Sequence, residues 1–167
     1  MEIETSRFGR MEIDPERIIT FTRGMLGFSA QKRYILFPHK EGSSFYWLQS
    51  VDDPWLAFVV ISPDVFCSDY EFELKDQVLQ ELKIERPEQV LVLVTVTVPK
   101  GNPGGLTANL LGPVVINMDE RLACQVILDP AVYPVAFPVV PSLEAKVKSS
   151  KAGPSDARKG SGRSMRY

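Results

Sequence analysis

The chain has 167 residues, of which 44% are hydrophobic and 24% are charged, as in an ordinary soluble domain. These proportions exclude a collagen-like chain, a disulfide scaffold and a wholly disordered protein. The longest apolar run, Val90 to Val98, is far shorter than the roughly 20 residues that a membrane-spanning helix needs. The first residues, Met1-Glu2-Ile3-Glu4, are acidic where a signal peptide is basic, so we expect a cytoplasmic protein with no membrane contact.

The formal net charge of −2 hides two regions of opposite sign, which meet after Leu143. Residues 144–167 carry seven basic and two acidic side chains, a net charge of +5, whereas residues 1–143 carry 12 basic and 19 acidic side chains, a net charge of −7. Because residues 144–167 have few large apolar side chains, we expect them to be a disordered basic tail, more simply a solvated appendage than a nucleic-acid arm. Residues 1–143 form one acidic domain, which should repel nucleic acid and favour basic partner surfaces.

Short β-strands dominate the first hundred residues. Apolar and polar residues alternate with a period of two, and turn residues such as Asp14-Pro15 and Ser62-Pro63-Asp64 interrupt the pattern about every ten residues. The runs that we interpret as strands are residues 18–23, 34–37, 45–49 and 56–61. Such regular spacing favours a closed or nearly closed antiparallel sheet, because closure removes exposed strand edges.

The second half of the domain contains one helix and three further strands. Leu74, Val78, Leu79 and Leu82 share one stripe of a 3.6-residue period, which predicts a short amphipathic helix over residues 75–83. Residues 89–98 are almost unbroken Val, Leu and Thr, as in a central strand buried on both faces; residues 114–117 and 123–128 predict a hairpin. The predicted fold is mainly β, a small antiparallel β-barrel-like or roll domain with one or two short helices.

Few residues suggest chemistry. His39 is the single histidine, and no nucleophile motif accompanies it, so we interpret it first as a solvated residue at a strand end. The glycine-rich loop at residues 101–105 lacks the Gly-Lys-Ser/Thr ending of a phosphate loop. Cys67 and Cys124 lack the spacing of a zinc site, and the simplest expectation is two buried thiols. We therefore predict neither a metal nor a cofactor.

Acidic and aromatic side chains are the better candidates for a binding surface. Five acids fit no cation-binding loop and could form a patch for a positively charged protein: Asp52, Asp53, Asp64, Asp69 and Glu71. Among the aromatic residues Phe45, Tyr46, Trp47, Trp55 and Phe58, one could anchor a partner, although core packing is the simpler interpretation.

Several motifs, in order along residues 3–140, resemble those of the FliW family of flagellar assembly factors. They include Gly24-Met25-Leu26-Gly27-Phe28 and Trp47-Leu48-Gln49-Ser50, and the longer run of residues 107–117 that contains Asn109, Pro113 and Asn117. The matching positions are Gly24, Gly27, Phe28, Leu48, Gln49, Ser50, Asn109, Pro113 and Asn117. The chain departs from the family pattern in lacking a proline between the two glycines and an acid after Phe28, and in its basic tail.

The resemblance implies a non-enzymatic, cytoplasmic protein with a mainly β fold and two protein partners. These are flagellin and CsrA, an RNA-binding translational repressor; free FliW antagonises CsrA, which couples flagellin synthesis to export by partner switching. From the residues alone, Asn109 and Asn117 are more simply explained as satisfying backbone groups at turns.

Two other function classes remain as alternatives. One is a small β-barrel enzyme that acts on a phosphorylated or acyl substrate with His39 and the loop at residues 101–105. The other is a barrel that binds single-stranded nucleic acid, which needs a basic groove with stacking aromatics, whereas the domain is acidic.

Overall fold

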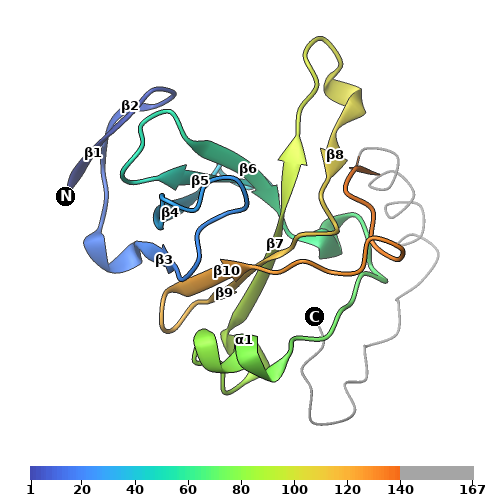
Figure 1. Cartoon of the computed structure of the whole chain (residues 1–167). Helices are drawn as coiled ribbons and strands as arrows, with labels where there is room; N and C mark the ends of the chain where they lie inside the picture. The colour runs from blue at the N-terminus through green and yellow to red at the C-terminus, as the bar shows by residue number, and fades with distance from the viewer. Residues whose placement is uncertain (140–167) are drawn as a thin grey trace.

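The structure is a computed structural model that describes residues 1–139. Eleven strands and one α-helix make up most of the ordered elements in this range (Figure 1). The strands are β1 (Glu2–Thr5), β2 (Gly9–Glu12), β3 (Ile19–Phe21), β4 (Arg33–Pro38), β5 (Phe45–Ser50), β6 (Ala57–Ile61), β7 (Val90–Thr97), β8 (Thr107–Ala108), β9 (Val114–Asn117), β10 (Leu122–Gln125) and β11 (Phe137–Pro138). The helix α1 is Asp76–Glu81, and four short 3-10 turns are Pro15–Arg17, Pro63–Val65, Pro87–Gln89 and Pro103–Gly105. The predicted tail, residues 144–167, and the end of the predicted domain lie outside the described residues.

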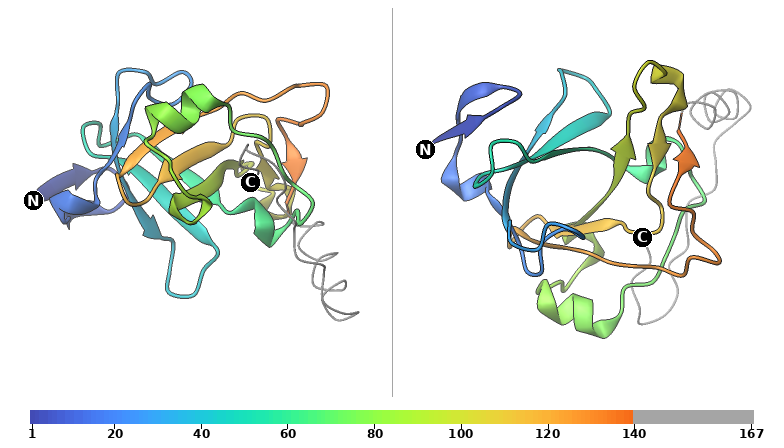
Figure 2. Two further views of the ribbon diagram at one scale, coloured as in Figure 1. Left: turned by 90° about the horizontal axis from the view of Figure 1, so that it is seen from below. Right: turned by 45° about the horizontal axis from the view of Figure 1, so that its top comes forward.

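Seven strands close into a barrel, which confirms the predicted fold class (Figure 2). The order around the ring is β7-β6-β5-β4-β3-β10-β9, and β9 pairs back onto β7. Six of these contacts are antiparallel, but β3 and β10 run parallel, with Leu122 opposite Thr20. The sequence predicted closure but not this parallel pairing, because it joins segments about a hundred residues apart.

The strands form because alternate side chains point to opposite faces of the sheet, and each face packs into its own apolar cluster. Side chains on one face fill the barrel, and Tyr34, Leu48, Val60, Leu93 and Ile116 are all at most 1% exposed there. On the outer face, residues 66–84 and α1 cover β6, β7, β9 and β10 with a second apolar cluster that includes Phe72, Leu82 and Val94. The hairpin of β1 and β2 covers β4 with Ile3 and Ile13. As predicted, β7 is central, since it pairs with β6, β8 and β9.

Three predicted elements had wrong boundaries. The strand predicted over residues 18–23 spans only Ile19–Phe21. The helix is shorter than residues 75–83 because Lys83 has a φ of 55°, and the bonds from Lys83 N to Gln80 O and from Ile84 N to Leu79 O form a Schellman cap. The strand predicted over residues 123–128 ends at Gln125. Val126 and Leu128 still donate to Pro113 O and Leu111 O, but Pro113 has no N–H to return the bond.

Candidate functional site

The loop after β3 is held by two glycines of the family motif. Gly24 has a φ of +73°, and a Cβ at this position would lie 2.7 Å from the Cα of Ser29. Gly27 has a φ of +84°, and Phe28 N donates to Met25 O at 2.8 Å. Both positive φ values favour glycine, so the loop folds back tightly. Its tip exposes two apolar side chains, Leu26 and Phe28.

The loop between β5 and β6 is built by side chains that bond to its own backbone. Ser50 Oγ accepts from Asp52 N at 3.2 Å and from Asp53 N at 3.0 Å. The buried Gln49 donates from Nε2 to Ser50 O at 3.0 Å and to Leu56 O at 3.1 Å. These bonds fix the turn, which explains why Gln and Ser stand in the Leu-Gln-Ser motif.

The same loop presents Trp55 to solvent. Asp53 Oδ1 accepts from Trp55 N at 2.9 Å, which places the indole outside the turn with 83% of its surface exposed. An isolated, fully exposed tryptophan is unusual, because this residue normally buries most of its surface. Of the five aromatic residues considered as partner anchors, Trp55 is the one that the structure leaves exposed.

Asp52 is paired across the barrel end with Arg33. The guanidinium group of Arg33 bonds to both carboxylate oxygens of Asp52, and this hydrogen bonding lowers the pKa of Asp52. Asp52 therefore remains charged at neutral pH. Its charge is paired with that of Arg33, whereas Asp53 Oδ1 accepts from the backbone N–H of Trp55.

The two loops lie at the same end of the barrel, which we call the motif end and define as residues 24–28 and 49–55. Phe28 packs edge-on against Phe58 of β6 at 5.4 Å, and Phe58 pairs with Leu48 of β5. The structure thus brings five family-motif positions from two separate parts of the sequence together at the motif end.

Gln125 connects the motif end to the third family motif, a role that sequence reasoning missed. Its Oε1 accepts from Leu26 N at 3.0 Å, and its Nε2 donates to Gly112 O at 2.9 Å. Asn109 Oδ1 in turn accepts from Leu111 N and Gly112 N at 3.0 Å, and the adjacent Pro113 is buried. The sequence signal that could have indicated this role is a glutamine near a strand end, the position that Gln49 also occupies.

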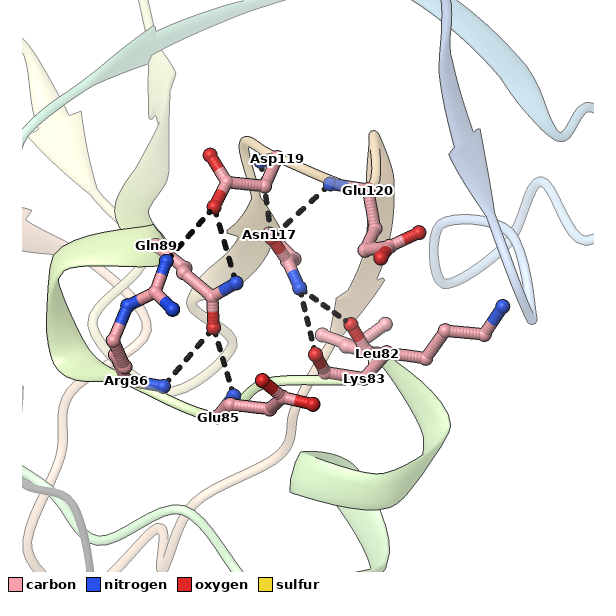
Figure 3. A network of polar contacts seen from close by, with 8 residues as sticks. All are labelled: Leu82, Lys83, Glu85, Arg86, Gln89, Asn117, Asp119 and Glu120. Carbon is pink, nitrogen blue, oxygen red and sulfur yellow. Dashed lines mark hydrogen bonds and ion pairs between the residues drawn. The ribbon is translucent and has the colours of Figure 1, made fainter.

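Asn117 ends β9, beside the starts of β7 and β10, and so lies at the opposite end of the barrel from the motif end. Its Nδ2 donates to Leu82 O at 2.8 Å and Lys83 O at 3.1 Å, and its Oδ1 accepts from Asp119 N and Glu120 N. Beside it Gln89 binds Asp119 Oδ2 at 3.1 Å (Figure 3). Asn117 and Asn109 thus both satisfy turn backbone, the structural role favoured from the sequence.

The five acids predicted as a patch fall into two groups at opposite ends of β6. Asp52 and Asp53 precede β6 at the motif end, whereas Asp64, Asp69 and Glu71 follow it. In the second group Asp69 accepts a bond from Cys67 Sγ at 3.3 Å, and the backbone oxygen of Glu71 accepts from the hydroxyl of Tyr133 at 2.6 Å. The acids do not form one continuous surface.

The two cysteines differ in burial, which corrects the expectation of two buried thiols. Cys124 is buried on β10, opposite Val115 of β9, and burial raises the pKa of its thiol. Cys67 is only half-buried, because it lies in the irregular segment after β6 rather than in a strand. Neither cysteine forms a disulfide.

His39 lies at the rim of a groove of about 600 Å³ beside β5 and β6. Its Nδ1 accepts from Trp47 Nε1 at 3.1 Å. Arg7 also lines the groove, and the remaining walls are apolar. Within residues 1–139, the groove lining contains no carboxylate, hydroxyl or thiol that His39 could activate. In the same range, no group of three or more His, Cys, Asp and Glu side chains is placed to hold a metal, and no helix is long and apolar enough to cross a membrane.

Comparison with known proteins agrees with this geometry. The family model described as FliW protein matches residues 2–139. A flagellar assembly factor FliW from Magnetococcus marinus is 42% identical over 158 residues, which cover 92% of this chain and 96% of the relative. One from Syntrophus aciditrophicus is 42% identical and covers 86% of this chain and 90% of the relative. These relatives are named as assembly factors rather than as enzymes.

A solved structure has the same fold. A crystal structure of the flagellar assembly factor FliW aligns with a TM-score of 0.77 and 35% identity, over 83% of this chain and 96% of that chain. The barrel, the motif end and the sequence matches therefore point to one conclusion: this chain belongs to the FliW family.

Proposed function

We propose that this protein is a cytoplasmic flagellar assembly factor that binds flagellin and, when flagellin has been exported, binds and antagonises CsrA. The two partners exclude each other, so free protein reports that flagellin has left the cell. The protein acts by binding other polypeptides and not by catalysis. Family membership supports this proposal, together with relatives that are named flagellar assembly factors.

The observation that carries the proposal is the exposed Trp55 beside Asp52 and Asp53 at the motif end. A rigid aromatic side chain next to carboxylates suits a partner that offers an apolar pocket with cationic groups around it. CsrA must be basic where it grips RNA phosphates, so the net charge of −7 over residues 1–143 attracts it. We propose Asp64, Asp69 and Glu71 as a secondary acidic contact.

Calorimetric titration of Trp55→Ala with flagellin and with CsrA tests the motif end. We expect at least one partner to bind about tenfold or more weakly, since a central tryptophan commonly contributes 2 kcal/mol or more. Val132→Ala is the matched control, because Val132 is 65% exposed and lies in the loop before β11. Unchanged affinity of Trp55→Ala for both partners contradicts the assignment of this site.

The electrostatic part of the proposal has its own test. CsrA affinity should fall as salt rises, because exposed charges are screened beyond about 8–10 Å at physiological ionic strength. An affinity for CsrA that does not change with salt concentration contradicts the electrostatic attraction. If this protein binds neither purified flagellin nor purified CsrA, the proposed function itself is contradicted.

A further inference from the structure

The outer face of the barrel has an apolar stretch that residues 1–139 leave partly exposed. Trp47 and Val59, both half-buried, are aligned across β5 and β6 by the sheet register with the buried Val96 of β7. On one side the β1–β2 hairpin covers β4, and on the other the β7–β8 hairpin rises beyond the barrel (Figure 1). Between them lies the groove of about 600 Å³, which we call the Trp47 groove.

The aromatic wall of the Trp47 groove is fixed before any partner binds. The ring of Phe8 packs edge-on against Trp47 at 5.3 Å and against Phe37 at 5.1 Å. The guanidinium carbon of Arg7 lies 4.7 Å from the centre of the Trp47 ring, and His39 holds the indole N–H. A wall that is already ordered loses little side-chain entropy on binding.

The opposite wall of the groove is apolar, formed by Val98 and Leu106 at the base of the β7–β8 hairpin. Val98 is 54% exposed. An apolar surface framed by polar groups is characteristic of a protein-binding site, and aromatic residues and arginine are enriched at such interfaces.

The charge of the groove lining indicates which kind of segment would bind there. The charged residue in its lining is Arg7, with His39 beside it, whereas residues 1–139 as a whole carry a net charge of −7. A segment with carboxylates next to its apolar side chains matches this cationic rim.

We propose that the Trp47 groove binds an acidic amphipathic segment of a partner protein, with apolar side chains on Val59, Val98 and Leu106 and a carboxylate on Arg7. This surface is chemically opposite to the motif end, where Asp52 and Asp53 favour a cationic partner. The proposal goes beyond the proposed function, because it assigns a second docking surface and does not depend on which protein occupies the motif end.

The test uses the full chain and two synthetic amphipathic peptides that share their leucines and carry either Glu or Lys on the polar face. Methyl NMR titration should show shifts at Val59, Val98 and Leu106, with the Glu peptide binding about tenfold or more tightly than the Lys peptide. Arg7→Glu should abolish or reverse this preference. Arg10→Glu is the control, because Arg10 lies on the same hairpin, 73% exposed, and pairs with Glu2 and Glu4 away from the groove.

Val98→Glu provides a second variant at an exposed position and should also weaken the Glu peptide. Three results would each overturn the proposal. The two peptides bind equally, the shifts are confined to other surfaces, or the Arg7→Glu variant prefers the Glu peptide as strongly as the unchanged protein does. Shifts at the groove that follow protein concentration rather than peptide indicate a second copy as the occupant and also overturn it. Titration of Trp55→Ala with the Glu peptide should leave the affinity unchanged, which separates this test from that of the motif end.

Discussion

Gly24 and Gly27 both have positive φ values, but only Gly24 is enclosed. Gly24→Ala places a methyl group 2.7 Å from Ser29 Cα and 3.0 Å from Phe28 O, in addition to the left-handed strain. Gly27→Ala has the strain alone, since nothing lies within 4 Å. We expect Gly27→Ala to lower the free energy of unfolding by about 1–2 kcal/mol, and Gly24→Ala by at least about 1 kcal/mol more. Urea denaturation measures both, and equal losses contradict the close contact.

Tyr34 fills the barrel with a hydroxyl group that has no hydrogen-bond partner among residues 1–139. An unsatisfied buried hydroxyl is unfavourable, so Tyr34→Phe should leave the free energy of unfolding unchanged or raise it by about 1 kcal/mol. Thermal and urea unfolding near pH 7 check this expectation. A loss above about 1 kcal/mol indicates that the hydroxyl is bonded after all.

The same residue predicts a dependence on alkaline pH. Burial raises the pKa of Tyr34 to about 12 from an ordinary value of 10.0, so the unfolded chain loses this proton first as pH rises. Ionisation of Tyr34 therefore leaves the free energy of unfolding unchanged below pH 10 and lowers it between pH 10 and about 12. Across this range the free energy of unfolding should fall less steeply with pH for Tyr34→Phe than for the unchanged protein. Equal slopes contradict the assignment of this loss to Tyr34.

The sequence predicted the role of some residues and only the type of others. Asn109 was expected to satisfy turn backbone, as it does, whereas the backbone bonds of Gln49 and Ser50 became visible only in the folded loop. Trp55 stood among five aromatic candidates, and nothing in its neighbours distinguished it, because exposure depends on how the turn is oriented. The role of Gln125 was missed since its partners, Leu26 and Gly112, are distant in sequence.

At the scale of elements, Asn117 joins the end of α1 to the turn between β9 and β10 (Figure 3). Asn117→Ala leaves the buried Leu82 O and three part-buried backbone groups without these partners, so we expect a loss of about 2–4 kcal/mol in the free energy of unfolding. Asn109→Ala is the comparison, because Asn109 supports a single half-buried turn and should lose about 1 kcal/mol. Urea denaturation measures both variants, and a smaller loss for Asn117→Ala than for Asn109→Ala contradicts the proposed link.

The elements themselves were largely predictable where one local signal decided them. Alternation located β4, β5 and β6 because one face of each strand is apolar, and continuous apolar runs located β7 and β9. Helical periodicity predicted α1. It extended α1 too far because the left-handed conformation of Lys83 has no signal in residue type. The groove beside Trp47 could not be predicted. It lies where neither the β1–β2 hairpin nor residues 66–84 cover the outer face of the sheet, and the sequence does not indicate which strands these segments cover.

At the scale of the whole molecule, closure of the sheet followed from many short strands, but the strand order did not. The parallel contact of β3 with β10 completes the ring, and only the packing of the shared core specifies it. The distribution of charge along the chain, by contrast, follows directly from the sequence and does not depend on the fold. It separates an acidic domain from a basic C-terminal segment.

That separation leads to a test by truncation after Leu143. Removal of residues 144–167 changes the net charge from −2 to −7 and should leave the barrel intact, since the family match ends at residue 139. If the segment is a solvated appendage, flagellin affinity should stay within about twofold, and CsrA should associate faster at low salt because the attraction is stronger. Stopped-flow mixing and calorimetry of the truncated and full-length proteins measure both quantities. Loss of binding to either partner, with circular dichroism unchanged, makes the basic segment part of the binding surface.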